Sequence, residues 1–325
     1  MFTIAVSGTH GKTTTTAMVG KILKDAGLDP TIIVGSLLKE GGTNFVAGKS
    51  KYFVVEACEY KRSFLHLNPN ILVITNIDND HLDYYKDIAD IQGAFNELAR
   101  KVPKDRYVIT NSRDAFVAPA LKNVRAKIID YTLEDSSGIS LEVKGAHNIL
   151  NAQAAISAAR ILKISPSTSL RALNKFSGTW RRFEYKGKTK TGALIYDDYA
   201  HHPTEIKATL KAARESYPNK KIIVIFQPHL YSRTKLLLNE FAKSFTDADE
   251  VIIAPTYAAR ESKDAGVSAE LLAQEIKKCH KNTSFMGSFD EIARYIAKHT
   301  RSSDVVITMG AGDVYLLCEE IIKST

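Results

Sequence analysis

Near the start of the chain stands the sequence Ala5-Val6-Ser7-Gly8-Thr9-His10-Gly11-Lys12-Thr13-Thr14. It follows an apolar run, Phe2–Val6, that is typical of a buried strand, and it precedes apolar residues at helical spacing between positions 17 and 26. A glycine-bounded loop in this setting, ending in a lysine and hydroxyls, predicts a phosphate-binding loop rather than an ordinary turn. The spacing departs from the common motif, because Val6 stands where a first glycine is usual.

The predicted loop carries several groups that bind nucleotide phosphates. Its small residues let backbone N–H groups approach phosphate oxygens, and the N-terminus of the following helix adds positive potential. Lys12 is placed to reach the β- and γ-phosphates, and Thr13 offers a hydroxyl to Mg²⁺.

Length and composition favour two globular domains. The 325 residues exceed the usual size of a single core, and 25% charged and 44% hydrophobic residues are ordinary values for a soluble protein. No apolar run approaches the roughly 20 residues that span a bilayer, and the N-terminus has no signal-peptide pattern, so we expect a cytoplasmic protein without membrane insertion. The three cysteines, Cys58, Cys279 and Cys318, are isolated from one another, which favours reduced thiols.

The formal net charge of +8 does not identify the ligand. Lysine and arginine residues are scattered among acidic ones and form no long basic block, so we do not expect a nucleic-acid partner. A mildly basic cleft serves anionic small substrates, such as nucleotides, equally well.

The first half of the chain predicts a mostly parallel α/β sheet. Strand-like runs occur at Thr31–Val34, Tyr52–Val55, Ile71–Thr75, Tyr107–Thr110 and Lys127–Tyr131. Helical patterns follow, one that starts after His147-Asn148 and runs to Leu162, and a shorter one at Pro166–Asn174.

The pattern then restarts and predicts a second, Rossmann-like unit. Strands are expected at Gly192–Asp197, Lys221–Phe226, Glu250–Ala254 and Ser303–Met309, with helices at Pro203–Ser216, Lys235–Phe245, Ser268–Lys278, Phe289–His299 and Asp313–Lys323. The polar stretch Phe176–Arg182 is the best boundary. We therefore expect an α/β protein with a P-loop central domain over residues 1–180 and a C-terminal Rossmann-like domain over residues 181–325.

Acidic residues at two strand ends predict a metal–nucleotide site. Glu56 ends one strand, where ligands approach open α/β sheets, so its carboxylate can meet the same Mg²⁺ as Thr13. The next strand ends in Thr75–Asp83, which adds carboxylates and His81. A surface role for Glu56 is the alternative, and His81 as a second Mg²⁺ ligand stays open because Mg²⁺ prefers oxygen.

Two amides, Asn148 and Asn151, stand three residues apart at a predicted helix start and so share one face. An amide can both donate to and accept from an adenine edge. The alternative for Asn148 is an N-cap.

Three polar strand ends follow in the second half, at Tyr196–Glu205, Phe226–Thr234 and Met309–Asp313. In a Rossmann-like unit they face one sheet edge, which favours a binding cleft over three separate capping loops.

Taken together, these motifs resemble the ATP-dependent Mur ligase family over nearly the whole chain. The resemblance rests on Gly8–Thr14, Glu56, Thr75–Ile77 with Asp80-His81, His147-Asn148 with Asn151, and Arg181–Glu184. Within the family, Glu56–Tyr60, Asp197–Glu205 and Phe226–His229 are most similar to the members that add L-alanine to UDP-N-acetylmuramate. The resemblance implies an amide-forming ligase of peptidoglycan precursor synthesis that uses ATP and Mg²⁺ through an acyl phosphate.

The resemblance also implies roles for single residues. ATP is contacted by the loop, by Asn148 and Asn151 at adenine, and by Arg182 and Asp198; the loop residues are Gly8, Thr9, His10, Gly11, Lys12, Thr13 and Thr14. Thr13 and Glu56 bind one Mg²⁺ and His81 the second. Tyr199, His201 and Arg233 face the muramyl carboxylate and the alanine, and the reaction itself is assigned to Lys12, Glu56, His81, Arg182 and Arg233.

Three departures from the family qualify this assignment. Members normally carry an N-terminal UDP-binding domain, so we expect a separate domain of on the order of 100 residues to supply that function. Leu230 stands where the alanine-adding members usually have arginine, and Ala258 where they have proline. Two alternatives stay open: a murein tripeptide recycling ligase, and a nucleotide-binding fragment that is inactive without the N-terminal domain.

Overall fold

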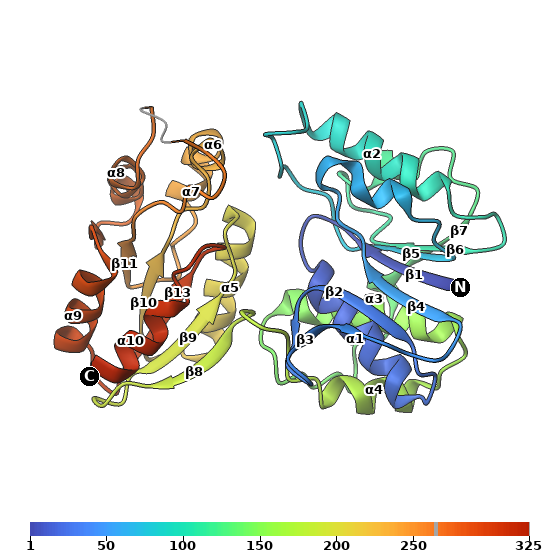
Figure 1. Ribbon diagram of the computed structural model, residues 1–325, viewed down its shortest axis with the longest axis horizontal. Helices are drawn as coiled ribbons and strands as arrows, with labels where there is room; N and C mark the ends of the chain where they lie inside the picture. Colours follow the sequence, from blue (N-terminus) through green and yellow to red (C-terminus); the bar gives the residue numbers. More distant parts are fainter. Residues whose placement is uncertain (263–265, 325) are drawn as a thin grey trace. The chain divides into compact units, whose positions relative to one another are not determined.

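The computed structural model describes residues 1–262 and 266–324. The chain forms two compact units, Met1–Trp180 and a second that begins at Arg181 (Figure 1). Each unit is a β-sheet with helices on both faces, so the expected α/β class is confirmed. None of the helices in these ranges combines the length and the apolar character that a bilayer-spanning helix needs.

The sheet of the first unit has seven strands in the order β3-β2-β4-β1-β5-β6-β7. Neighbouring strands are parallel, except that β3 pairs with β2 antiparallel. The strands are β1 (Phe2–Ser7), β2 (Thr31–Leu38), β3 (Thr43–Val46), β4 (Tyr52–Glu56), β5 (Ile71–Ile74), β6 (Tyr107–Thr110) and β7 (Lys127–Asp130).

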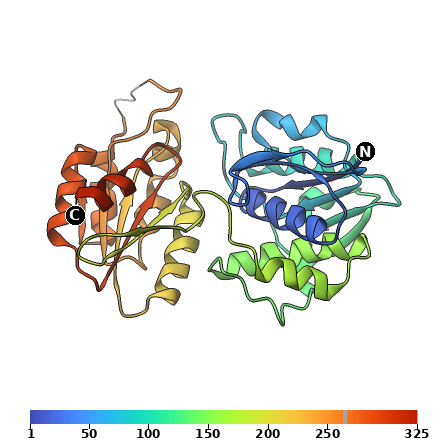
Figure 2. The same ribbon diagram turned by 60° about the horizontal axis from the view of Figure 1, so that its bottom comes forward.

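Helices cover both faces of this sheet. They are α1 (Lys12–Asp25), α2 (Ile88–Arg100), α3 (Ala146–Ile161) and α4 (Pro166–Asn174), with short 3-10 helices at Tyr60–His66, Ala118–Leu121 and Tyr131–Leu133. In Figure 2, α1 (blue) lies beside the green helices α3 and α4, whereas α2 lies on the opposite face.

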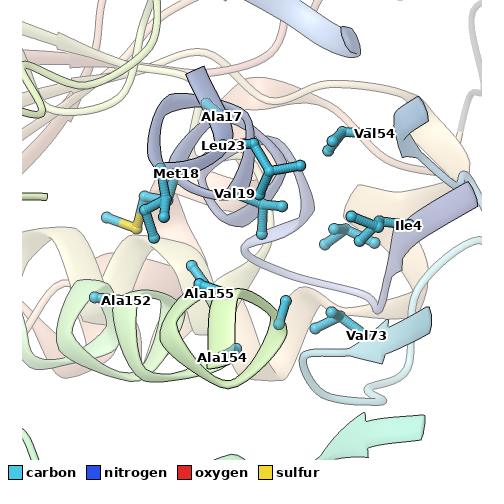
Figure 3. Close-up of a cluster of buried hydrophobic side chains, with 14 of the residues drawn as sticks. Ile4, Ala17, Met18, Val19, Leu23, Val54, Val73, Ala152, Ala154 and Ala155 are labelled. Atoms are coloured by element: carbon cyan, nitrogen blue, oxygen red, sulfur yellow. The ribbon is translucent and has the colours of Figure 1, made fainter. Parts of the chain in front are cut away.

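The core between α1, α3 and the sheet fixes the start of α1. Figure 3 shows Ile4 and Val73 of the sheet facing Val19 and Leu23 of α1, with α3 alongside α1 and its labelled alanines in the same cluster. These aliphatic side chains are fully buried, and each contributes about 1.5–3 kcal/mol of transfer free energy. The core therefore holds the loop before α1 against the strand ends.

The second unit repeats this plan with the strand order β12-β11-β10-β13-β9-β8. Its strands are β8 (Glu184–Lys188), β9 (Leu194–Asp198), β10 (Lys221–Phe226), β11 (Glu250–Ile253), β12 (Thr283–Phe285) and β13 (Asp304–Met309). Its helices are α5 (Pro203–Ser216), α6 (Tyr231–Leu236), α7 (Leu238–Ala242), α8 (Ala269–Cys279), α9 (Phe289–His299) and α10 (Leu316–Ser324). The strands pair in parallel apart from the antiparallel edge strand β8.

The structure corrects several sequence predictions. The short edge strands β3, β8 and β12 were not predicted, and β8 carries two lysines, a glutamate and a glycine, a composition that is unusual for a strand. The single helix predicted over Lys235–Phe245 is wrong, because α6 ends at Leu236 and α7 begins at Leu238. This bend lets Leu237 and Phe241 reach the same apolar cluster.

A buried arginine fastens the start of the second unit to its sheet. Arg181 is 2% exposed, and its Nε donates to Asp197 Oδ2 at 2.7 Å. Its two terminal nitrogens donate to Gly312 O at 2.9 Å and Gly310 O at 2.5 Å. Thr308 Oγ1 donates to the other oxygen of Asp197 at 2.7 Å. The guanidinium thus ties the first residue of the unit to the ends of β9 and β13.

We predict that Arg181→Met lowers the free energy of unfolding by about 3–5 kcal/mol, because it leaves the Asp197 charge buried without its cation. Chemical denaturation followed by circular dichroism measures this change. Arg294→Met, on the exposed side of α9, is the matched control and is expected to cost less than about 0.5 kcal/mol. Equal effects of the two substitutions would contradict the role of Arg181.

Candidate functional site

Three strand ends meet at one edge of the first sheet. Strand β1 lies between β4 and β5 and is parallel to both, with Val6 opposite Glu56 and Ser7 opposite Ile74. The loop after β1, the carboxylate that ends β4 and the segment after β5 therefore come together.

The loop between β1 and α1 requires glycine at two positions. Gly8 and Gly11 have φ of 132° and 82°, in the region that favours glycine. A Cβ on Gly8 would lie 2.0 Å from Thr75 Oγ1, and one on Gly11 would lie 2.5 Å from Asn151 Oδ1. Gly11 is also the N-cap of α1, with no side-chain cap. The first-turn amides are thus left to a ligand, as in a phosphate-binding loop.

The end of β5 holds this loop in place through Asn76. Asn76 Oδ1 accepts from His10 N at 2.9 Å, and Asn76 Nδ2 donates to His10 O at 3.0 Å. The backbone oxygen of Asn76 accepts from Thr9 N at 3.0 Å. His10 Nε2 lies 3.0 Å from Asp78 Oδ2, so the His10 side chain is directed to the same segment. Asn76 belongs to the motif Thr75–Ile77, but the sequence analysis did not predict it as a site residue.

Lys12 lies over the loop with three acceptors around its ammonium. Nζ donates to Gly8 O at 2.6 Å, to Thr9 O at 2.9 Å and to Glu59 Oε1 at 2.9 Å. Burial by itself lowers the pKa of Lys12, but the charge and hydrogen bond of Glu59, together with the Glu56 charge, outweigh it, so the pKa lies above its ordinary value. Lys12 is therefore a cation in the folded protein.

Thr13 and Glu56 form a pair of oxygen donors beside the loop. Thr13 Oγ1 donates to Glu56 Oε1 at 2.9 Å, and Gly35 N donates to Glu56 Oε2 at 2.5 Å. Thr14, next along α1, is buried. A hydroxyl and a carboxylate next to a phosphate-binding loop are hard ligands that fit Mg²⁺. The structure brings these two predicted residues together.

His81 is linked to Lys12 by Glu59, a residue that the sequence analysis did not predict as part of the site. His81 Nε2 lies 3.5 Å from Glu59 Oε1, and the Tyr60 ring lies 4.8 Å from the imidazole. Burial by itself raises the pKa of Glu59, but Lys12 and His81 together hold it below its usual range. The signal for Glu59 was its position three residues after Glu56, at the same strand end.

The two amides of α3 lie together, but Asn148 is not the N-cap. Gly145 holds that position, and Asn148 Nδ2 donates to Lys144 O at 2.7 Å. Asn151 Nδ2 donates to Asn148 Oδ1 at 3.2 Å, and both side chains are buried. Since Asn151 also touches Gly11, the pair adjoins the phosphate-binding loop.

In the second unit, β9, β13 and β10 are parallel neighbours, so their three polar ends share one edge as predicted. The Arg182 guanidinium lies 5.2 Å from the centre of the Tyr199 ring, and Arg182 Nη1 lies 3.9 Å from Glu205 Oε1. His201 Nδ1 lies 3.0 Å from Tyr199 O and 3.3 Å from Glu205 Oε2. Glu205 thus contacts both Arg182 and His201, which were predicted as site residues, although Glu205 was not.

Arg233 lies in α6, the short helix that follows the end of β10. Its Nη1 is 3.2 Å from His229 Nδ1, and the His229 ring is stacked on Tyr257 and 6.0 Å from the His201 ring. Leu230 is 3% exposed with φ of 69°, so its side chain is packed into the unit rather than displayed at this edge.

Asp198 is the most perturbed carboxyl group at this edge. Its two oxygens accept from Phe183 N and Ala200 N, both at 2.7 Å. Burial raises the pKa of Asp198 to about 6, against the opposing effect of the Arg182 charge. These two backbone bonds show Asp198 holding the turns that present Arg182 and Tyr199.

These features are typical of a P-loop nucleotide-binding protein of two α/β units. They are the phosphate-binding loop with its lysine, the hydroxyl–carboxylate pair and the second, Rossmann-like unit. Models of two domains match the chain: the Mur ligase middle domain over residues 6–159, and the Mur ligase glutamate ligase domain over residues 181–312. The chain belongs to the Mur ligase family, whose members are ATP-dependent ligases of peptidoglycan synthesis.

Individual relatives agree with this membership. The UDP-N-acetylmuramate--L-alanine ligase of Clostridium acetobutylicum is 45% identical, over 99% of this chain and 76% of that protein. The crystal structure of UDP-N-acetylmuramate-alanine ligase from Thermotoga maritima has a TM-score of 0.80 at 29% identity, over 99% of this chain and 75% of that chain. A crystal structure of a murein peptide ligase from Psychrobacter arcticus has a TM-score of 0.72 at 26% identity, over 99% of this chain and 77% of that chain.

We predict that the Asp198 carboxyl group stabilises the fold at low pH. Its pKa is about 6 in the folded protein against an ordinary 3.8, so this stabilisation is complete below pH about 4 and is lost as the pH rises through about 6. The unfolding free energy of the wild type minus that of Asp198→Asn should therefore fall by about 3 kcal/mol between pH 4 and pH 7. Denaturation at both pH values measures it; a constant or rising difference would refute the prediction.

Proposed function

We propose that this chain joins L-alanine to the carboxylate of UDP-N-acetylmuramate in a reaction that converts ATP to ADP and phosphate. The observation that carries the proposal is the 45% identity to the Clostridium acetobutylicum ligase over nearly the whole chain. The murein peptide ligase structure is 26% identical, which makes tripeptide ligation the second candidate. The grouping of Lys12, Thr13 and Glu56 at one sheet edge supports the use of ATP in both cases.

The first step activates a poor electrophile. A muramyl carboxylate oxygen attacks the γ-phosphorus, the bond from that phosphorus to the β,γ-bridging oxygen breaks, and ADP leaves with the electron pair. The product is an acyl phosphate. Lys12 offsets the negative charge on the transferred phosphoryl group, which is the main catalytic requirement of such a transfer.

The second step forms the amide. The neutral alanine amine attacks the acyl carbon, and the tetrahedral intermediate then expels phosphate with the electron pair of the C–O bond while the nitrogen loses one proton to solvent and keeps the other as the amide N–H. We assign the carboxylates of alanine and of the muramyl group to Arg233, His201 and Tyr199. An arginine suits this task, since its planar fork matches a carboxylate.

Each part of the nucleotide is assigned to named residues. Asn148 and Asn151 hold adenine, Gly8–Thr14 the phosphates, and Arg182 a further part of the nucleotide, with Asp198 fixing the turn beside it. Thr13 and Glu56 would hold one Mg²⁺ and His81 a second, and the ions would neutralise charge on the phosphates. UDP-N-acetylmuramate and L-alanine are thus the proposed substrates.

We predict that the wild-type chain forms UDP-N-acetylmuramoyl-alanine from ATP, Mg²⁺, UDP-N-acetylmuramate and an equimolar amino-acid mixture. Lys12→Ala should lower the rate by about 10³-fold or more, because the γ-phosphoryl charge loses its cation. Mass spectrometry detects the product, and Lys24→Ala, in the last turn of α1, is the matched control.

Two further arms separate the alternatives. Tripeptide replaces the amino acids in one, and a product there without an alanine product would overturn the substrate assignment. In the other, the part of the Clostridium acetobutylicum relative outside the matched region is added, which tests for the separate UDP-binding domain. Nucleotide binding without product in any arm would make the chain a nucleotide-binding module.

A further inference from the structure

Glu59 is buried where the ligase chemistry is proposed, yet no role has been assigned to it. Its side chain is 2% exposed and follows the end of β4 by three residues. Its backbone oxygen accepts from Tyr85 Oη at 2.5 Å and from Arg62 N at 2.8 Å. These two bonds hold the backbone at Glu59, from which the carboxylate extends.

One oxygen of Glu59 serves two residues of the proposed machinery. Oε1 accepts from Lys12 Nζ at 2.9 Å and lies 3.5 Å from His81 Nε2. An ammonium has three hydrogens, and the Lys12 ammonium uses the other two on Gly8 O and Thr9 O. A phosphate oxygen can therefore bond to Lys12 only by replacing one of these acceptors.

The three acceptors are not equivalent. Gly8 O and Thr9 O are neutral carbonyls of the loop itself, whereas Glu59 carries a charge of the same sign as the phosphates. A bond to a charged acceptor is roughly twice as strong as one to a neutral acceptor, so Glu59 orients Lys12 most strongly. The same charge opposes an approaching polyanion. The Glu59 carboxylate thus orients Lys12 but lowers the affinity for the nucleotide.

The second oxygen of Glu59 is incompletely bonded. Oε2 is buried without a hydrogen-bond donor among the residues that the structure describes. Buried polar atoms normally have such a donor, so the carboxylate is held less completely than its burial requires. Tyr60 and Asp80 hold His81 independently, through the ring contact and through the Asp80 Oδ1 bond to His81 N at 2.7 Å. Glu59 is therefore the element that links His81 to Lys12.

We propose that Glu59 is a positioning residue that holds Lys12 and His81 in the arrangement needed for phosphoryl transfer, and that it does so at the cost of nucleotide affinity. This inference rests on the proposed function for its effect on turnover. Its effect on nucleotide binding is independent of the substrates.

The test is Glu59→Gln, which keeps the shape of the side chain and removes its charge. A non-hydrolysable ATP analogue is titrated calorimetrically, in EDTA and again in Mg²⁺. The dissociation constant of the variant should be about tenfold lower than that of the wild type in both conditions. Product formation at saturating ATP should be at least about tenfold slower, because Lys12 and His81 lose their common acceptor.

Two control variants accompany it. Glu97→Gln makes the same charge change on α2, where Glu97 is 61% exposed, and should leave the binding of the analogue unchanged. Glu59→Asp keeps the charge but shortens the side chain, so nucleotide affinity should stay near that of the wild type while product formation slows. Circular dichroism and thermal unfolding verify that each variant is folded.

Three outcomes would overturn the inference. Unchanged or weaker analogue binding by Glu59→Gln in EDTA would mean that the carboxylate does not oppose the nucleotide. Weaker binding only in Mg²⁺ would make Oε2 a metal ligand instead. Tighter binding with undiminished turnover would remove the positioning role. If the wild type forms no product while Glu59→Gln binds the analogue more tightly, the proposed function fails and the effect of Glu59 on nucleotide affinity stands.

Discussion

Parallel pairing of β1 with β4 and β5 is the constraint on which the nucleotide site depends. In a parallel sheet every strand delivers its carboxyl end to the same edge, so residues distant in sequence become neighbours. Lys12 meets Glu59 across 47 positions, and His10 meets Asn76 across 66. The buried core beneath α1 then prevents the loop from leaving that edge. The site is thus a consequence of strand direction combined with core packing.

Two buried ion pairs show how one kind of contact serves two purposes. Arg181 and Asp197 are fully bonded, since the guanidinium faces rigid carbonyls and both carboxylate oxygens accept bonds. Lys12 and Glu59 form a looser pair, with a compact ammonium at the end of a flexible chain and one carboxylate oxygen left without a described donor. The complete pair suits a structural role, whereas the incomplete pair suits the phosphate contact that we propose for Lys12.

The success of sequence interpretation varied with the range of the interactions. The helices Pro166–Asn174, Pro203–Ser216 and Phe289–His299 were predicted with their observed bounds, because each has a proline or serine signal at its start and one apolar face. Strand β8 was missed, since its pairing with β9 overrides a composition that disfavours strands. For Asn148 the N-cap was the alternative to the predicted adenine contact, and the structure excludes that alternative because Gly145 takes the N-cap position. Local patterns therefore failed where a distant strand or a loop conformation decided the outcome.

The amino-acid sequence by itself determined the alternation of strands and helices, the division into two α/β units and the chemical types that stand at each strand end. It also placed Lys12, Thr13 and Glu56 together, because the strand–loop–helix motif and the end of a neighbouring strand are visible in the pattern. Only the tertiary structure decided that Glu59 links Lys12 to His81, that Asn76 fastens the phosphate-binding loop and that Arg181 is buried at the start of the second unit. The physical reason is that hydrophobic periodicity shows which face of a helix or strand is buried, but not which other segment lies against it. These contacts join segments whose distance is set by strand order and packing.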